Sequence, residues 1–142
     1  MMVLFVCVGN SMRSQMAEVL FNQLAPRNYY AKSAGTQPAD RVSSKAIEVM
    51  KEIGIDISNA KPKLITPEMV KEAYKIITMG CINESSCPAF LIKDKSKLKD
   101  WDIEDPRGKT IEEVRKARDE IKRRVEQLIE KLRAIDKNSK FA

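Results

Sequence analysis

The sequence predicts an α/β fold: a three-layer sandwich built around a four-stranded parallel sheet. First, residues 2–7 form a continuously apolar run, which is typical of a parallel strand buried on both faces. Second, runs of this kind alternate with segments of helical periodicity, and this alternation favours a parallel sheet covered by helices. Third, a length of 142 residues suits a single core. We expect residues 1–142 to form one domain, with residues 136–142 as a flexible tail.

The predicted strands are short runs rich in apolar and β-branched residues. They lie at residues 2–7, 29–34, 74–79 and 99–101. Gly35 closes the second strand, and Gly80 follows the third. After the third strand comes a polar stretch, INESSCPAFLIKDKSKLKD, which has no sustained periodicity and is long for a connection in a compact domain. Such segments are usually functional or mobile.

The predicted helices carry recognisable start and stop signals. They span residues 14–24, 44–53, 67–73 and 111–135. A serine at position 43 or 44 caps the second helix, and Gly54 is placed to terminate it. Thr66 precedes a proline at the start of the third helix and acts as its cap. Thr110 and Glu113 form a capping box for the last helix.

Composition narrows the classes of function. The net charge is +6, and the basic excess lies in the last helix, where acidic side chains are interleaved with basic ones. This pattern is typical of a solvated helix face, so we expect no nucleic-acid binding, although a basic interaction module is an alternative. No apolar run is long enough to span a bilayer and the start lacks a basic leader, so we expect a cytoplasmic monomer without membrane contact. Three cysteines imply reactive or metal-binding thiols in a reducing compartment.

Cys7 lies where the first strand gives way to a loop. Ligands of open parallel sheets bind beyond the carboxyl ends of the strands, which is the position of Cys7. Loop N–H groups and a helix N-terminus favour an anion and a thiolate, and Gly9 allows close approach. Arg13 presents a planar fork to two oxygens, and the Ser14 hydroxyl can bond the sulfur. We therefore predict a nucleophile in an oxyanion cradle, with a buried core thiol as the alternative. The predicted oxyanion-binding residues are Val8, Gly9, Asn10, Ser11, Met12 and Arg13.

The pattern Cys-x5-Arg-Ser after the first strand, together with Asp105-Pro106, resembles the low-molecular-weight protein tyrosine phosphatase family. The resemblance implies the fold of that family and a role for Asp105 as the general acid that protonates a leaving oxygen. A turn residue is the alternative for Asp105, because Asp-Pro favours turns. Within this fold, the segments GNSMRSQMAE, YAKSAGTQP, AIEVMKEIGIDIS, ITMGCINESSCP and WDIEDPRG resemble the thioredoxin-coupled arsenate reductases. The phosphatases usually carry aromatic residues after Asp-Pro, where this chain has Arg107-Gly108.

The closer resemblance implies reduction of arsenate to arsenite by three thiols. Cys7 attacks arsenate to form a thiol–arsenate adduct, Cys81 attacks the sulfur of Cys7, and Cys87 carries the disulfide outward to thioredoxin. The expected substrate is arsenate, with phosphate or sulfate as mimics, and no cofactor is bound. Three alternatives stay open: a phosphatase that hydrolyses phosphotyrosine, a zinc site made by the cysteines, and an idle Cys87.

The resemblance also implies a potassium ion beside the cradle, because many members hold one through asparagine, glutamate, serine and an acidic residue. Asn10, Glu18 and Ser33 match the first three positions. The acidic position falls at Lys63, with Lys61 nearby, so we expect the ammonium group of Lys63 to replace the ion and predict no metal. Solvated side chains are the alternative for Glu18 and Lys63, and Asn10 is expected to hold the loop whatever the ion.

Overall fold

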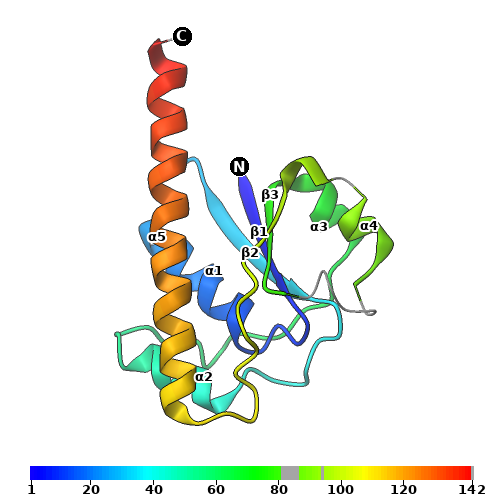
Figure 1. The fold of residues 1–142 in the computed structure, drawn as a ribbon, viewed down its shortest axis with the longest axis vertical. Coiled ribbons are helices and arrows are strands. Elements are labelled where there is room, and N and C mark those ends of the chain that lie inside the picture. The colour runs from blue at the N-terminus through cyan, green and yellow to red at the C-terminus, as the bar shows by residue number, and fades with distance from the viewer. Residues whose placement is uncertain (81–86, 94, 142) are drawn as a thin grey trace.

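The computed structural model describes residues 1–80, 87–93 and 95–141, with side chains described up to residue 137. Its elements form one α/β domain (Figure 1). They are β1 Met2–Cys7, α1 Arg13–Leu24, β2 Tyr30–Gly35, α2 Ser44–Lys51, α3 Pro67–Glu72, β3 Ala73–Thr78, α4 Ala89–Ile92, the 3-10 helix η2 Lys95–Lys97, β4 Leu98–Asp100 and α5 Ile111–Phe141. Among the described residues, no helix is both long and apolar enough to cross a membrane.

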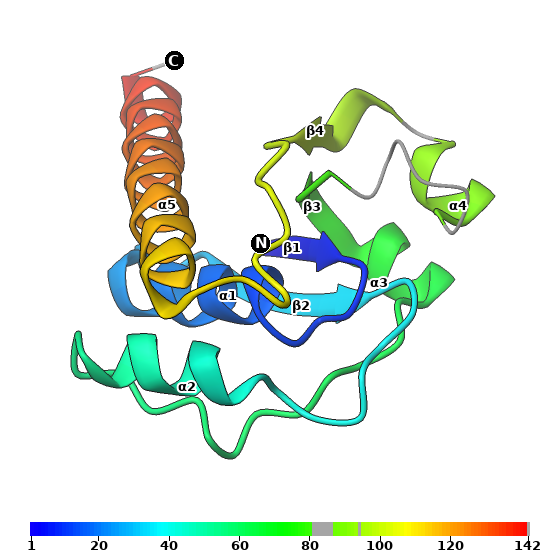
Figure 2. The same cartoon turned by 60° about the horizontal axis from the view of Figure 1, so that its bottom comes forward.

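The sheet has four parallel strands in the order β2-β1-β3-β4. Every residue of β1 is buried, as expected for a central strand with both neighbours paired and both faces covered. Figure 2 shows α1, α2 and α5 on one side of the sheet and α3 and α4 on the other. The predicted three-layer arrangement is therefore confirmed.

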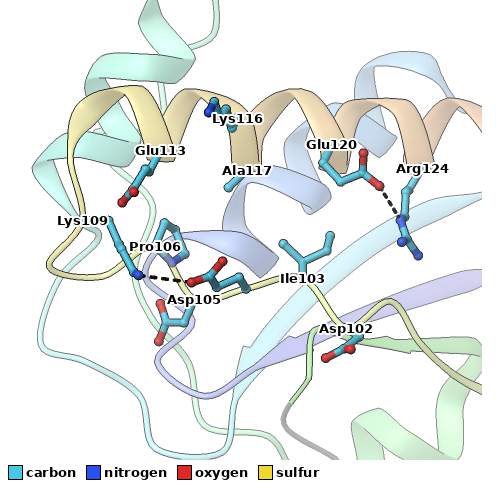
Figure 3. A pocket seen from close by; sticks show the side chains of 11 residues that line it. Asp102, Ile103, Asp105, Pro106, Lys109, Glu113, Lys116, Ala117, Glu120 and Arg124 are labelled. Atoms are coloured by element: carbon cyan, nitrogen blue, oxygen red, sulfur yellow. Dashed lines mark hydrogen bonds and ion pairs between the residues drawn. The ribbon is translucent and has the colours of Figure 1, made fainter.

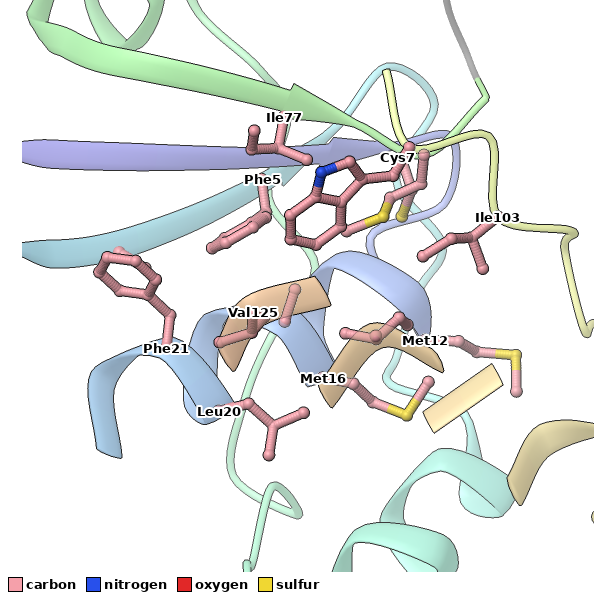
Figure 4. Close-up of a cluster of buried hydrophobic side chains, with 14 of the residues drawn as sticks. Phe5, Cys7, Met12, Met16, Leu20, Phe21, Ile77, Ile103 and Val125 are labelled. Atoms are coloured by element: carbon pink, nitrogen blue, oxygen red, sulfur yellow. The ribbon is translucent and has the colours of Figure 1, made fainter. Parts of the chain in front are cut away.

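Two hydrophobic clusters fill the spaces between the layers. The larger one packs the Phe5 ring against Phe21 and Trp101, with ring centroids 5.9 Å and 5.6 Å apart, and reaches Cys7 at the end of β1 (Figure 4). The smaller cluster joins the opposite face of β1 to α3 and α4, with Leu91 fully buried. Because both faces of β1 are packed, its carboxyl end is a rigid platform for the loop that follows.

Local signals predicted several element boundaries. Thr66 Oγ1 accepts a hydrogen bond from the Met69 N–H at 3.2 Å, and Thr110 Oγ1 accepts from the Glu113 N–H at 3.3 Å, as their capping roles require. Gly54 has a φ of 81°, the left-handed conformation that suits a glycine after a helix. Position 43 is the N-cap of α2, but its side chain makes no capping hydrogen bond.

Other expectations need correction. The segment between β3 and β4 contains α4 and η2, although its sequence shows no helical periodicity; a four-residue helix is too short to show one. Residues 136–141, expected to belong to a flexible tail, continue α5 beyond its predicted end at residue 135 (Figure 1). No proline or glycine interrupts that helix, and Asp136 ties it to the domain by accepting hydrogen bonds from Asn28 and Tyr29 at 3.3 Å and 3.1 Å. The observed β2, β3 and β4 are each displaced along the chain by one residue from the predicted strands.

Candidate active site

The thiol of Cys7 lies at the carboxyl end of the central strand, beside the start of α1. The residue is 2% exposed. Its Sγ lies 2.9 Å from Ser14 Oγ and accepts the backbone N–H of Asn10 at 3.2 Å. Sulfur is therefore held between a loop N–H and a hydroxyl at the N-terminus of a helix, which favours negative charge there.

Asn10 locks this arrangement through its side chain. Its Nδ2 donates to Ser14 Oγ at 2.7 Å, while its Oδ1 accepts from Gln15 Nε2 at 3.1 Å and from the Lys63 N–H at 2.9 Å. The bond from Asn10 fixes the Ser14 hydroxyl beside the Cys7 sulfur, where the hydroxyl can donate to a thiolate. Asn10 also has a φ of 49°, a left-handed conformation that asparagine tolerates better than most residues.

The carbonyl groups of the cradle loop turn away from Cys7. Backbone N–H groups of the segment 36–43 donate to them, with lengths of 2.9–3.2 Å. The accepting carbonyls belong to Cys7, Val8, Gly9 and Ser11. The loop is thus held from outside by main-chain bonds, an arrangement suited to turning N–H groups toward a bound anion.

Gly35, at the end of β2, packs directly against the cradle loop. It pairs with Cys7 in the sheet, and a Cβ at this position would lie 2.6 Å from the Val8 carbonyl oxygen and 3.0 Å from the Asn10 nitrogen. Only glycine allows this approach of two backbones. From the sequence, Gly35 is predicted only to end a strand, because its contact with the loop depends on which strand pairs with β1.

Arg13 is buried next to the cradle and is oriented by main-chain oxygens. Its Nη1 donates to the carbonyls of Met79 and, at 2.9 Å, Ile103, which follow β3 and β4. Its Nη2 lies 3.6 Å from Asp105 Oδ2. The structure therefore brings Asp105 from a distant part of the chain to Arg13, which ends the loop that begins at Cys7.

Arg107 is a further charged residue at this site. Its Nε donates to Asp105 Oδ2 at 2.7 Å and its backbone N–H donates to Oδ1 at 3.0 Å. In the sequence, Arg107 stands out only because it occupies a position where the phosphatases usually carry an aromatic residue. A turn predicted at Asp105-Pro106 would have placed Arg107 close to the Asp105 carboxylate, so this contact could have been predicted from the sequence.

Of the other two cysteines, the structure describes only Cys87. Cys81 lies outside the described residues. Gly80 precedes Cys81 in the sequence, and a Cβ added to Gly80 would lie 3.9 Å from Arg13 Nη1. The Gly80 N–H donates to Asp100 Oδ1 at 2.6 Å. Cys87 is half-buried and packs against the smaller hydrophobic cluster.

Known proteins with similar sequences belong to the family that the Cys7 loop and Asp105 indicate. The family model described as low molecular weight phosphotyrosine protein phosphatase matches residues 2–139. The chain belongs to this phosphatase family. An arsenate reductase of Staphylococcus aureus is 39% identical over 124 residues, covering 87% of this chain and 92% of that protein.

Solved structures agree with the family assignment. The YwlE arginine phosphatase from Geobacillus stearothermophilus has a TM-score of 0.86 and 30% identity, and the match covers 96% of each chain. An arsenate reductase in the phosphate binding state has a TM-score of 0.78 and 36% identity, with 92% of this chain and 97% of that chain covered. The fold predicted from the sequence is thus the fold of the phosphatase family.

The residues beside the cradle do not fit the potassium ion that the family resemblance implies. Asn10 Oδ1 already accepts two N–H groups, so it has no lone pair left for a cation. The Lys63 ammonium lies 4.0 Å from Glu18 Oε1. Burial raises the pKa of Glu18, and the charge of Lys63 opposes that rise. A cation of the chain itself therefore stands beside the carboxylate, and Ser33 is buried next to them.

A cavity of about 460 Å³ lies between the Asp-Pro loop and α5 of this phosphatase-family domain (Figure 3). Carboxylates and cations both line it, including Asp105, Glu113 and Lys116. No residue of the cradle loop lines it. The cavity is consequently a neighbour of the site on the outer side of Asp105, and the oxyanion cradle is a separate feature.

Proposed function

We propose that this protein is an enzyme that reduces arsenate to arsenite with electrons from thioredoxin. The 39% identity with an arsenate reductase supports the substrate, and the similar arsenate reductase in a phosphate binding state supports a tetrahedral oxyanion in the cradle. One observation carries the redox part of the proposal. Gly80, the residue before Cys81 in the sequence, lies beside Arg13, so the segment that follows β3 reaches the cradle that begins at Cys7.

Binding and attack form the first step. The loop N–H groups and the Arg13 fork bind the arsenate oxygens, and the buried thiolate of Cys7 attacks arsenic. Ser14 and the Asn10 N–H stabilise the thiolate before attack. An As–OH bond breaks as the S–As bond of the thiol–arsenate adduct forms, and the leaving hydroxyl takes a proton from Asp105, the expected general acid, and departs as water.

Electron transfer is the second step. The Cys81 thiolate attacks the sulfur of Cys7, so an S–S bond forms and the S–As bond breaks. The electron pair of the broken bond stays on arsenic, which leaves as arsenite with two electrons gained. Phosphate binds in the same cradle but does not take part in this step, because phosphorus is not reduced by thiols.

Regeneration is the third step. The Cys87 thiolate attacks the sulfur of Cys81, which frees Cys7 and moves the disulfide away from the cradle. Reduced thioredoxin then reduces the Cys81–Cys87 disulfide and is itself oxidised. No bound cofactor is needed, because thioredoxin supplies both electrons, and we propose that the enzyme acts as a monomer.

A coupled assay tests the function. We expect oxidation of NADPH by thioredoxin reductase and thioredoxin only when this enzyme and arsenate are both present. Phosphate in place of arsenate is the matched control and should give no oxidation. No arsenate-dependent oxidation with a folded, phosphate-binding enzyme would contradict the proposal.

Trapped species test the order of the thiols. Cys7→Ser should be inert, and Cys81→Ser should form the adduct without releasing arsenite. Cys87→Ser should release about one equivalent of arsenite per enzyme and stop with a Cys7–Cys81 disulfide. Mass spectrometry of alkylated single-turnover mixtures distinguishes these states. Continued turnover of the Cys87 variant with thioredoxin would show that Cys87 is not the final relay.

Hydrolysis of phosphotyrosine is a second candidate function. It is favoured by one observation, the Asp105 carboxylate 3.6 Å from Arg13, where a general acid is expected to reach a leaving oxygen. A phosphatase should turn over an aryl phosphate quickly and should not depend on Cys81. Measurement of both activities on the same preparation therefore separates the two functions.

A further inference from the structure

A tight turn holds the Arg107 side chain against the Asp105 carboxylate. The Arg107 backbone N–H donates to Oδ1 and its Nε donates to Oδ2. Two bonds from one residue to both oxygens of the same carboxylate fix the direction of the guanidinium group, because the side chain is tied at its base and near its tip. Arg107 is therefore oriented although 54% of its side chain is exposed.

The oriented guanidinium group lies over the cradle loop. Its Nη1 is 3.7 Å from the position of a Cβ on Gly9. Arg13 approaches the same Asp105 oxygen from the buried side and is only 7% exposed. Asp105 thus bridges an inner and an outer guanidinium group, and the outer one faces both the loop and solvent.

This position matters for the part of a substrate that points away from Cys7. For in-line attack, the group opposite the nucleophile turns toward the outer side of the loop. In free arsenate or phosphate that group is an oxygen without a substituent. In a phosphomonoester it is the ester oxygen with its organic group attached. A guanidinium group at that place attracts a free, charged oxygen and occupies volume that an organic group needs.

We propose that Arg107 is a specificity-determining residue that selects free tetrahedral oxyanions over phosphomonoesters with aromatic groups. The identity of the preferred oxyanion as arsenate rests on the proposed function, whereas the selection applies to any tetrahedral dianion in the cradle. Arg107 adds a second charge for the dianion beyond Arg13. It also narrows the approach over Gly9.

Substitution of Arg107 tests the proposal with two ligands. The first readout is the Kd of inorganic phosphate, measured by calorimetry. The second is kcat/KM for p-nitrophenyl phosphate. Arg107→Ala should weaken phosphate binding about threefold to tenfold, a range expected for one partly exposed charged hydrogen-bond donor. The same variant should raise kcat/KM for the aryl ester by a similar factor.

Two variants separate charge from bulk. Arg107→Met keeps most of the volume without the charge, so it should weaken phosphate binding and still disfavour the aryl ester. Lys109→Ala removes an equal charge from the same loop, where Lys109 pairs with Glu104. This variant should change neither the Kd of phosphate nor kcat/KM for p-nitrophenyl phosphate. Melting temperatures of all variants show whether each one folds.

The outcomes are distinct. If Arg107→Ala lowers phosphate binding and aryl ester turnover together, Arg107 only holds Asp105 in place, and the proposal is wrong. Equal values for wild type and Arg107→Ala also overturn it. The proposed function is tested separately, because the contrast between phosphate and the aryl ester needs no arsenate reduction. Arsenate turnover by wild type without this contrast would reject only the role of Arg107.

Discussion

Replacement of Gly35 by alanine should damage the cradle from a residue that never touches substrate. The added Cβ would lie 2.6 Å from the Val8 oxygen, and ordinary contact begins near 3.4 Å, so the carbonyl must move by about 0.8 Å. Gly35 itself is held, because its N–H donates to the Lys63 carbonyl at 2.7 Å and its carbonyl accepts from the Ile65 N–H at 2.9 Å. The cradle loop is therefore the part that moves.

The expected size of the effect follows from that displacement. A misplacement on the order of 1 Å can lower a rate by about 100-fold, so we expect arsenate turnover by Gly35→Ala to fall by about 10- to 100-fold. Overpacking should lower the free energy of unfolding by about 1–3 kcal/mol. Coupled turnover, phosphate calorimetry and urea unfolding measure the three quantities.

Gly54→Ala is the matched control for the cost of a lost glycine. Gly54 has a φ of 81° and no atom within 4 Å of an added Cβ, so the substitution strains the backbone without a clash. We expect a loss of about 1 kcal/mol in unfolding free energy with unchanged turnover. If Gly35→Ala binds phosphate and turns over like the wild type, the close approach of the two backbones does not shape the cradle, and the argument fails.

Three further predictions concern the thiols and the residues beside the cradle. A weak hydrolysis of a small aryl phosphate should be lost in Cys7→Ser and survive in Cys81→Ser; loss in the Cys81 variant would mean that the thiols are wrongly assigned. Exchange of sodium for potassium should leave melting temperature and turnover unchanged, because Lys63 already lies 4.0 Å from Glu18, and a potassium-specific rise in melting temperature would contradict this. Because burial raises the pKa of Glu18 above its ordinary 4.5, the native state holds a proton that the unfolded chain has lost, and stability should fall as pH rises from 4.5 through the raised pKa. Urea midpoints across this range should show a shallower fall for Glu18→Gln, and an equal slope would refute the role of its burial.

Local sequence patterns predicted most of the fold, because the signals lie within a few residues of what they control. The apolar run of β1 and the cap at Thr66 are of this kind. The end of α5 was missed, since its continuation involves the contact between Asp136 and Tyr29 at the other end of the chain. Burial and the hydrogen bond to Asp136 raise the pKa of Tyr29 to about 12. Such long-range partners leave no periodic trace in a sequence.

The candidate site likewise combines features that local sequence predicts with contacts that depend on distant segments. The cluster from Cys7 to Ser14 is contiguous, so a strand end, a loop and a helix start were enough to predict a nucleophile beside Arg13. The approach of Gly35 depends on strand pairing, which a run of apolar residues does not specify. The contact of Arg107 with Asp105 depends on the shape of a single turn. The missed features are those that join the contiguous motif to distant segments.

These long-range contacts explain how the same kind of cradle can serve two reactions, ester hydrolysis and reduction of a free oxyanion. Main-chain bonds from the segment 36–43, the N–H of Lys63 and the carbonyls near Arg13 hold the loop, and all of them belong to the sheet and its connections. The position of a tetrahedral oxyanion is therefore set by the scaffold, whatever happens to the oxyanion next. The outcome depends on what the surrounding segments bring to it: a proton donor and room for an organic group lead to ester hydrolysis, whereas a second thiol and a guanidinium group over the loop favour reduction of a free oxyanion. Arg107 and the cysteines after β3 are accordingly the residues at which a change of chemistry should be sought.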